Sequence, residues 1–227
     1  MLKVNFAGWA MHLLPSGAVY LPGASTLLVA DAHFGKAVSF RLAGVPVPQG
    51  TTTETLQRLT DAVAQTAATR VIFLGDFLHS AKAHAAPTQH AIASWRASHP
   101  ELALTLVRGN HDDRAGDPPA ALGVQVVDEP LMLTTDAVGA LSLALCHHPQ
   151  RVAGAYVLAG HAHPCVVLTG AGRDRLRLPC FWLGDVQANP AGVLPAFGSF
   201  TGMHPIERKP RDRVFAVAGS AVQEVPA

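Results

Sequence analysis

Three things are scarce in this sequence: cysteines, charged residues and long hydrophobic runs. The 227 residues include three cysteines, Cys146, Cys165 and Cys180, and no C-x-x-C spacing. An odd number without that spacing argues against a disulfide framework and against a thiolate zinc site, so we expect buried thiols that act as small hydrophobic side chains. The apolar runs stop far short of the ~20 residues that cross a bilayer. We therefore expect no contact with a membrane.

An excess of charge of one sign is also missing. Seventeen Lys and Arg stand against sixteen Asp and Glu, which gives a net charge of +1. A chain with so little net charge does not attract polyanions as a whole, so any nucleic acid must be bound at a local site. The first residues show no small-residue cleavage site, which predicts a cytoplasmic location. The hydrophobic content of 49% is ample for a core, and we expect one domain over residues 1–227.

The order of the apolar runs predicts an α/β fold. Thr51 with Glu54 forms the pattern of a capping box and predicts a helix to about residue 68, and a second helix is expected over 88–98. After His163 the pattern is of strands alone. Before it, buried strands are expected at 25–30, 69–74, 101–107, 141–146 and 155–159. Helices between early strands, followed by a strand-rich end, predict a β-sandwich of two mixed sheets flanked by helices.

Each of these five strands is followed by side chains of the kinds that bind metals. The loops read Asp31-Ala32-His33, Gly75-Asp76, Arg108-Gly109-Asn110-His111-Asp112, His147-His148 and Gly160-His161-Ala162-His163. Ligand sites in open α/β sheets gather beyond the carboxyl ends of strands, so we expect these loops to meet in one crevice. Asp31 and His33 are two residues apart, so in an extended loop both can point to one side and chelate together, and His161 and His163 repeat this spacing. The glycines permit a sharp turn and a close approach of the backbone.

The ligand types predict a centre of two metal ions. Carboxylate, amide oxygen and imidazole suit manganese, iron or zinc, and we expect manganese first. Seven candidates are too many for a single ion that keeps open positions. They are Asp31, His33, Asp76, Asn110, His147, His161 and His163. Two ions roughly 3.5 to 4 Å apart are the arrangement that clamps the attacking and leaving oxygens of a displacement at phosphorus.

The motifs DxH, GD, GNHD, a strand-end His and GHxH occur in this order from Asp31 to His163. In this the sequence resembles the calcineurin-like metallophosphoesterase superfamily. The resemblance implies one metal held by Asp31, His33, Asp76 and His163. It implies a second held by Asp76, Asn110, His147 and His161, with Asp76 as the bridge. His148 is the alternative to His147 as a ligand, and we favour His147 because it comes first after the strand.

A narrower resemblance rests on VADAHFGKAVSFRLAGVPVPQGTTTETLQRL, followed by FLGDFLHS, GHAHP and LPAFGSFTG. These stretches, over roughly residues 8 to 203, are similar to the bacterial ligase-associated DNA-damage-response endonucleases, the PdeM-type phosphoesterases. The resemblance implies a nuclease whose substrate is DNA and whose partners are a DNA ligase, an exonuclease and a helicase.

The predicted reaction is metal-assisted hydrolysis of a phosphodiester. His111 follows the ligand Asn110 and is placed to protonate the leaving oxygen. Asp112 is expected to fix the tautomer of His111 or to raise its pKa.

Candidate substrate contacts are Lys36, Arg41, Arg108 and His148. In the family, Lys36 and Arg41 look like phosphate contacts, the one a point charge and the other a bidentate fork. Arg108 is open to a second interpretation, in which it braces Asp112 or Asp113, and His148 to one in which it supports the metal ligands. Arg173, Arg175 and Arg177 alternate on a predicted hairpin, and they form either a track for the DNA backbone or a solvated edge.

Two other functions stay open, because the same centre serves many substrates. One is a phosphodiesterase or phosphatase acting on nucleotides or cyclic nucleotides, which the near-neutral charge favours. The other is a non-catalytic scaffold of a repair complex. Loss of catalysis usually shows as missing ligands, and here all seven are present.

Overall fold

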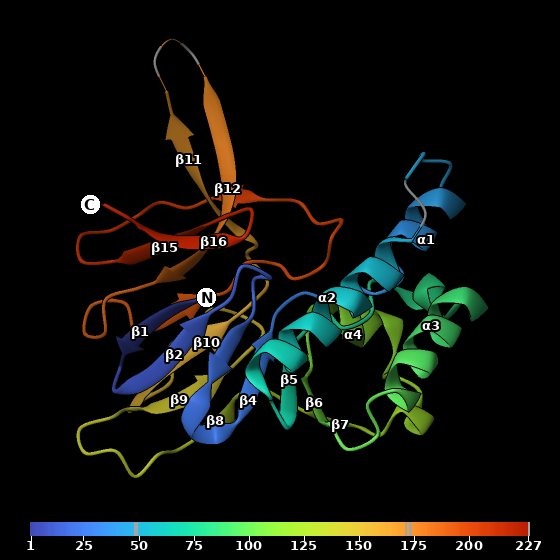
Figure 1. The fold of residues 1–227 in the computed structure, drawn as a ribbon, viewed down its shortest axis with the longest axis horizontal. Coiled ribbons are helices and arrows are strands. Elements are labelled where there is room, and N and C mark those ends of the chain that lie inside the picture. The colour runs from blue at the N-terminus through green and yellow to red at the C-terminus, as the bar shows by residue number, and fades with distance from the viewer. Residues whose placement is uncertain (48–49, 171, 173, 227) are drawn as a thin grey trace.

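Two β-sheets lie face to face in the computed structural model, which describes residues 1–47, 50–170, 172 and 174–226 (Figure 1). The first sheet has seven strands in chain order. These are β1 (Leu2–Phe6), β2 (Trp9–Leu13), β3 (Val19–Leu21), β4 (Thr26–Val29), β5 (Arg70–Leu74), β6 (Ala103–Val107) and β7 (Val124–Val127). Neighbours from β1 to β4 are antiparallel, and neighbours from β4 to β7 are parallel.

The second sheet has nine strands and is also mixed. Its main path runs β14 (His204–Pro205), β11 (Pro164–Thr169), β12 (Arg175–Leu183), β13 (Ala191–Val193), β10 (Ala155–Ala159), β9 (Ser142–Leu145) and β8 (Leu131–Leu133). β15 (Arg213–Ala218) pairs with β12 and with β16 (Ala221–Val225). β10 is parallel to both β9 and β13, whereas β12 is antiparallel to its neighbours. The predicted sandwich of two mixed sheets is confirmed.

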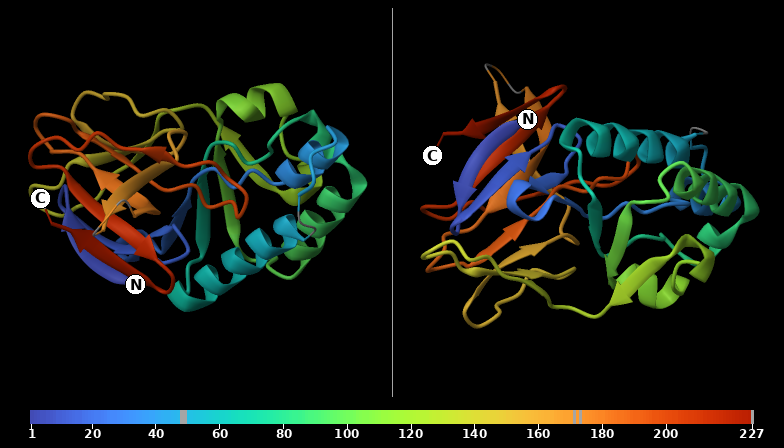
Figure 2. Two further views of the ribbon diagram at one scale, coloured as in Figure 1. Left: turned by 90° about the horizontal axis from the view of Figure 1, so that it is seen from above. Right: turned by 60° about the horizontal axis from the view of Figure 1, so that its bottom comes forward.

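The described α-helices gather beside the first sheet (Figure 2). They are α1 (Lys36–Leu42), α2 (Thr51–Thr66), α3 (Ala86–Ala97) and α4 (Asn110–Ala115). Short 3₁₀ helices are η1 (Pro22–Ala24), η2 (Ala81–His84) and η3 (Ala120–Leu122). Among the described residues, no helix is long and apolar enough to cross a membrane.

The first sheet is buried on both faces because its parallel strands alternate between two cores. In β5, Val71 and Phe73 pack with the helices, while Ile72 and Leu74 pack between the sheets. Successive side chains of a strand point to opposite faces, so a continuous apolar run is what such a strand requires. The loops beyond these strands therefore start from a rigid base.

The start of α2 differs from the predicted capping box. Gly50, with φ of 84°, is the N-cap and makes no side-chain bond, and Thr51 is already helical. The carboxylate of Glu54 faces Arg58 at 3.4 Å instead of capping the helix. Glycine takes the positive φ without strain, so the backbone rather than a side chain sets the entry to the helix.

The three cysteines are free and buried, as predicted. Burial raises the pKa of Cys146 to about 11 and that of Cys180 to about 12. The reactive thiolate is therefore scarce at pH 8. We expect iodoacetamide at pH 8 to leave the folded protein unlabelled for about an hour, and to label all three thiols in guanidinium chloride, as read by intact mass. Rapid labelling of the folded chain would contradict this assignment.

Candidate metal centre

The five loops meet where the two sheets adjoin. β4, β5 and β6 are parallel neighbours in the first sheet, and β9 and β10 are parallel neighbours in the second. The backbone N–H of His161 donates to both carboxylate oxygens of Asp31, at 3.1 and 2.9 Å, and so links the sheets. The structure brings together all seven predicted ligands, Asp31, His33, Asp76, Asn110, His147, His161 and His163.

One group of donor atoms lies around His33. Its Nε2 is 3.3 Å from Nε2 of His163 and 3.8 Å from Oδ2 of Asp76. Nε2 of His163 lies 3.7 Å from Oδ1 of Asp31. Ligand atoms about 2.1 Å from one ion are about 3 to 3.5 Å apart, and two imidazole nitrogens that face each other suit a shared cation. These four side chains fit a metal ion.

A second group lies around His147. Its Nε2 is 2.9 Å from Oδ1 of Asn110 and 3.1 Å from Nδ1 of His161. The other oxygen of Asp76, Oδ1, lies 3.4 Å from the same Nε2. The two oxygens of Asp76 therefore face different groups, as a bridging carboxylate requires.

Burial lowers the pKa of two imidazoles of this cluster, which favours the neutral form that binds metals. It lowers the pKa of His33, and the positive charge of Lys36 lowers it further. Burial also lowers the pKa of His161, followed by the charges of His147 and His148. Nδ1 of His147 lies 3.0 Å from the carbonyl of Leu74, a contact that orients the ring with Nε2 toward the centre.

Five of the seven side chains stand on backbone with positive φ. The residues are Asp31, His33, Asp76, His161 and His163, with φ between 45° and 68°. Non-glycine residues adopt this region at a cost, and such residues cluster at functional sites. An extended loop does not describe these segments, so the predicted chelation geometry of alternate residues in an extended chain is wrong. Each ligand pair instead converges through a left-handed turn.

The three glycines let the loops touch. A Cβ at Gly75 would lie 2.1 Å from Nδ1 of His147, and one at Gly109 would lie 2.6 Å from Oδ1 of Asp76. A Cβ at Gly160 would lie 2.7 Å from Oδ2 of Asp31. Only Gly75 of the three has positive φ, at 78°. The close approach of the backbone that the sequence predicts is present at all three glycines. The sharp turn is left-handed at Gly75 and not at Gly109 or Gly160.

His111 lies at the centre, but with a different partner from the one expected. Its Nδ1 is 2.6 Å from the carbonyl of His79, and its Nε2 is 4.0 Å from Oδ2 of Asp76. Asp112 instead accepts the backbone N–H groups of Gly109 and Leu78, at 3.0 and 3.1 Å. The carbonyl of His79 fixes the tautomer of His111, and Asp112 ties two metal loops together. Burial raises the pKa of Asp112 to about 6, although the hydrogen bonds from the two N–H groups act to lower it.

The contacts of Arg108 argue against a role in substrate binding. Its guanidinium faces Asp117 at 2.9 Å, Asp128 at 3.0 Å and Asp113 at 4.0 Å. These partners use the donors that a phosphate would need, so the contacts favour a bracing role, but mainly toward Asp117 and Asp128 instead of the predicted Asp112 or Asp113.

His148 shares a partner with His147 that the sequence did not reveal. Glu129 accepts the backbone N–H of both residues, at 2.6 and 3.0 Å, and lies 2.9 Å from Nδ1 of His148. His147 is fully buried with its Nε2 in the cluster, whereas the His148 side chain is 43% exposed. The geometry favours His147 over His148 as the ligand. Nothing in the sequence around Glu129 marks it, because it lies in a loop far from the motifs.

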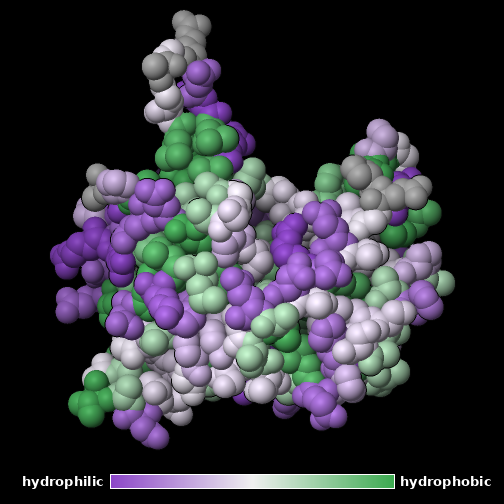
Figure 3. All heavy atoms as spheres, in the orientation of Figure 1, coloured by the Kyte–Doolittle hydropathy of each residue, from purple (hydrophilic) through white to green (hydrophobic). Residues whose placement is uncertain are grey.

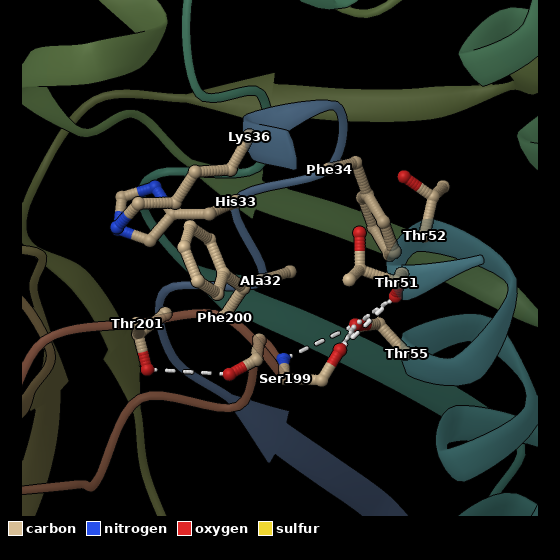
Figure 4. Close-up of a pocket in the computed structure, with 11 residues that line it drawn as sticks. Ala32, His33, Phe34, Lys36, Thr51, Thr52, Thr55, Ser199, Phe200 and Thr201 are labelled. Atoms are coloured by element: carbon tan, nitrogen blue, oxygen red, sulfur yellow. Dashed lines mark hydrogen bonds between the residues drawn. The ribbon is translucent and has the colours of Figure 1, made fainter. Parts of the chain in front are cut away.

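Lys36 lines a small pocket beside His33 (Figure 4). Burial lowers its pKa, while Asp31 and Asp76 act in the opposite direction. Phe200 lies across the same pocket, on a loop where Ser199 bonds to Thr55 at 3.0 Å. That loop also holds the first metal loop, since Gly198 N donates to the carbonyl of Asp31.

Arg41 is placed apart from this pocket. It lines a second one with Thr52 and Thr88, and its Nη1 lies 3.5 Å from the carbonyl of Val47. Lys36 lines the pocket that includes His33, whereas Arg41 lines a pocket that does not, and both remain predictions as substrate contacts.

Comparison with solved structures places this site in a family. The crystal structure of Pseudomonas putida nuclease MPE is 42% identical in sequence, with 99% of each chain covered and a TM-score of 0.83. The chain belongs to the metallophosphoesterase family of that nuclease. The resemblance inferred from the motifs is thereby confirmed, and the enzyme class is that of a hydrolase of phosphodiester bonds.

More distant likenesses were also found. The phosphoesterase Yfce from E. coli is 12% identical, with a TM-score of 0.44, over 88% of this chain and 97% of that one. A protein of unknown function from Aquifex aeolicus, AQ665, is 17% identical, with a TM-score of 0.43, over 61% of this chain and 78% of that one. A scan of family profiles matched none, and no curated protein matched.

Proposed function

We propose that this metallophosphoesterase is a two-metal DNA endonuclease. The observation that supports it best is the division of the Asp76 carboxylate, with Oδ2 toward His33 and Oδ1 toward His147. A single ion would not need a carboxylate shared between two complete donor groups. The Pseudomonas putida relative is a nuclease, which supports a nucleic acid over a small nucleotide as the substrate, and the motifs shared with the ligase-associated endonucleases support DNA.

The chain's own residues would each do a separate task. Asp31, His33 and His163 would hold one ion, Asn110, His147 and His161 would hold the other, and Asp76 would be shared between them. Divalent ions at such a centre supply a lowered pKa for water and neutralise charge at phosphorus. Lys36, which lines the same pocket as His33, would bind a phosphate oxygen. His111 presents Nε2 toward Asp76, where the leaving oxygen would take its proton.

The substrate is tested by comparing three classes of substrate with manganese present: DNA, bis-p-nitrophenyl phosphate and cyclic nucleotides. We expect nicking of a closed plasmid or cutting of a labelled single strand, together with hydrolysis of bis-p-nitrophenyl phosphate. Intact DNA with rapid hydrolysis of cyclic nucleotides would replace the nuclease by the nucleotide phosphodiesterase. No hydrolysis of any of the three would favour the scaffold.

His111→Gln is expected to lower turnover of DNA by about 10² to 10⁴-fold, the usual contribution of a general acid. Glutamine keeps a polar side chain of similar reach but cannot transfer the proton. The measurement is kcat on DNA beside metal content, which should stay at the wild-type value because His111 is not a predicted ligand. Unchanged turnover would remove His111 from the mechanism.

Bis-p-nitrophenyl phosphate refines this assignment. Nitrophenolate leaves without a proton, so its hydrolysis should fall far less than that of DNA in the same variant. An equal fall on both substrates would point to a disturbed metal centre instead of a lost acid.

The wider setting is part of the same proposal. We propose manganese as the metal, DNA repair as the process, a cytoplasmic location, and a DNA ligase, an exonuclease and a helicase as partners. The motifs shared with the ligase-associated endonucleases support these points. Metal analysis of the purified chain and pull-down with each partner are the direct tests.

A further inference from the structure

A long hairpin, β11 with β12, projects from the body of the molecule on the same side as α1 (Figure 1). Both projections begin at the metal centre. β11 starts at Pro164, directly after His163, and α1 starts at Lys36, three residues after His33. Since the Nε2 atoms of His33 and His163 are 3.3 Å apart, the hairpin and α1 leave from adjacent points. Figure 3 shows the surface hollowed between the two.

The two faces of this hairpin differ in chemistry. In the strand register, Leu168 lies opposite Leu176, while Val167 lies opposite Arg177 and Thr169 opposite Arg175. Side chains alternate between faces, so both arginines share one face and both leucines the other. Strongly hydrophilic side chains lie along the side of the hairpin that is turned toward α1 (Figure 3). Arg173, which the sequence adds to this series, lies outside the described residues.

Arg175 and Arg177 are exposed, and no contact with a carboxylate is found for either within the described part of the chain. Two arginines elsewhere in the described chain are paired with carboxylates. Arg213 faces Glu224 at 2.7 Å, and Arg108 faces Asp117 at 2.9 Å. An unpaired guanidinium keeps its fork of donors available for a phosphate. Arginines of one face, spaced by two residues, repeat about every 6.8 Å.

We propose that the arginine face of the hairpin, formed by Val167, Thr169, Arg175 and Arg177, binds the phosphate backbone of a polynucleotide whose scissile phosphate lies at the metal centre. This inference rests on the proposed function and gives the enzyme a second area of contact with its substrate, apart from the metal centre. Counted from His163 at ~3.4 Å per residue, the positions opposite Arg177 and Arg175 lie roughly 14 and 20 Å along β11. At ~3.4 Å per nucleotide, the spacing along one strand of a duplex, that distance spans about four to six nucleotides.

The test measures how DNA affinity depends on salt. A labelled single strand of about 12 nucleotides is titrated by fluorescence anisotropy at several salt concentrations, in the Asp76→Asn background, which prevents cleavage. Each lost phosphate contact lowers the slope of log K against log salt by roughly 0.7 for single strands. Arg175→Ala with Arg177→Ala should therefore lower the slope by roughly 1.4 and weaken binding at 50 mM salt by roughly tenfold or more. An unchanged slope would overturn the inference.

Matched variants separate charge from structure. Lys3→Ala removes one positive charge from β1, in the other sheet, and should leave the slope unchanged. Arg175→Lys with Arg177→Lys should keep most of the slope, because counterion release depends on charge. A dinucleotide should bind equally well to wild type and to the double alanine variant, because its one internucleotide phosphate would lie at the metal centre and does not reach the arginine face. Equal losses on short and long strands would overturn the assignment.

Hydrolysis of bis-p-nitrophenyl phosphate distinguishes this inference from the proposed function. The double alanine variant should hydrolyse it at the wild-type rate, because that substrate occupies the metal centre alone. If the Asp76→Asn chain with both arginines does not bind DNA and the wild type does not cut it, the proposed function fails together with the inference. If the Asp76→Asn chain binds DNA both with and without the two arginines, and the two salt slopes agree, only the inference fails.

Discussion

The Asp76→Asn variant is expected to lose at least about 10³-fold in phosphodiester hydrolysis, which corresponds to about 4 kcal/mol of transition-state stabilisation. The two carboxylate oxygens of Asp76 face different donor groups, Oδ2 at 3.8 Å from His33 and Oδ1 at 3.4 Å from His147. The amide has no charge, and its NH₂ group would point at one of the ions. The metal content should fall from about two ions per chain to about one or fewer.

Asparagine is the right replacement because of the backbone. Asp76 has φ of 52°, a conformation that asparagine tolerates well and alanine does not. Circular dichroism and thermal unfolding should therefore match the wild type, so that a loss of activity reports on the metals. Asp61→Asn, on the exposed face of α2, removes the same charge and should keep activity within about twofold. Full activity of Asp76→Asn with two bound metals would reject the bridging role.

Gly75→Ala is expected to lower the free energy of unfolding by about 3 kcal/mol or more. A left-handed φ costs an L-residue about 1 to 2 kcal/mol, and overpacking of a core costs about 1 to 3 kcal/mol. The added Cβ would lie 2.1 Å from Nδ1 and 2.4 Å from Cγ of His147, which is fully buried. For a chain of this size the melting temperature should fall by about 6 to 12 °C.

Gly44→Ala is the matched control for this experiment. Gly44 has φ of 79°, against 78° at Gly75, but a Cβ there would meet nothing within 4 Å. It should cost only the backbone term of about 1 kcal/mol. The difference between the two variants measures the collision with His147, and metal binding should be weakened in Gly75→Ala alone. Equal effects of the two substitutions would show that the contact with His147 does not matter.

Much of the fold was predictable because the strands are buried. Continuous apolar runs such as 69–74 can satisfy both of their faces only inside a layered structure, and each run was followed by polar residues. The structure places β5 at Arg70–Leu74 and β6 at Ala103–Val107, close to the expected ranges. The entry to α2 was missed, because the backbone of Gly50 carries no side-chain signal.

Charge partners in the site were harder to predict. Asp112 and Arg108 are adjacent to the motifs, and proximity in sequence predicted that they act on His111 and on substrate. The structure gives Asp112 the N–H groups of Gly109 and Leu78, and gives Arg108 the carboxylates of Asp117 and Asp128. Burial decides the first, since two buried N–H groups need an acceptor. The partners of Arg108 follow from the path of the chain, which passes beside its guanidinium again at Asp117 and at Asp128.

The sequence by itself determined which side chains reach the cluster, because each follows a strand whose end is fixed by its apolar run, and it determined the family. Only the tertiary structure decided how those side chains face one another. Positive φ at Asp31 and His33 turns the loops in a way that spacing does not encode. Glu129 reaches His147 from 18 residues away. Such contacts depend on how separate loops pack, and packing is a property of the whole folded chain rather than of any local segment.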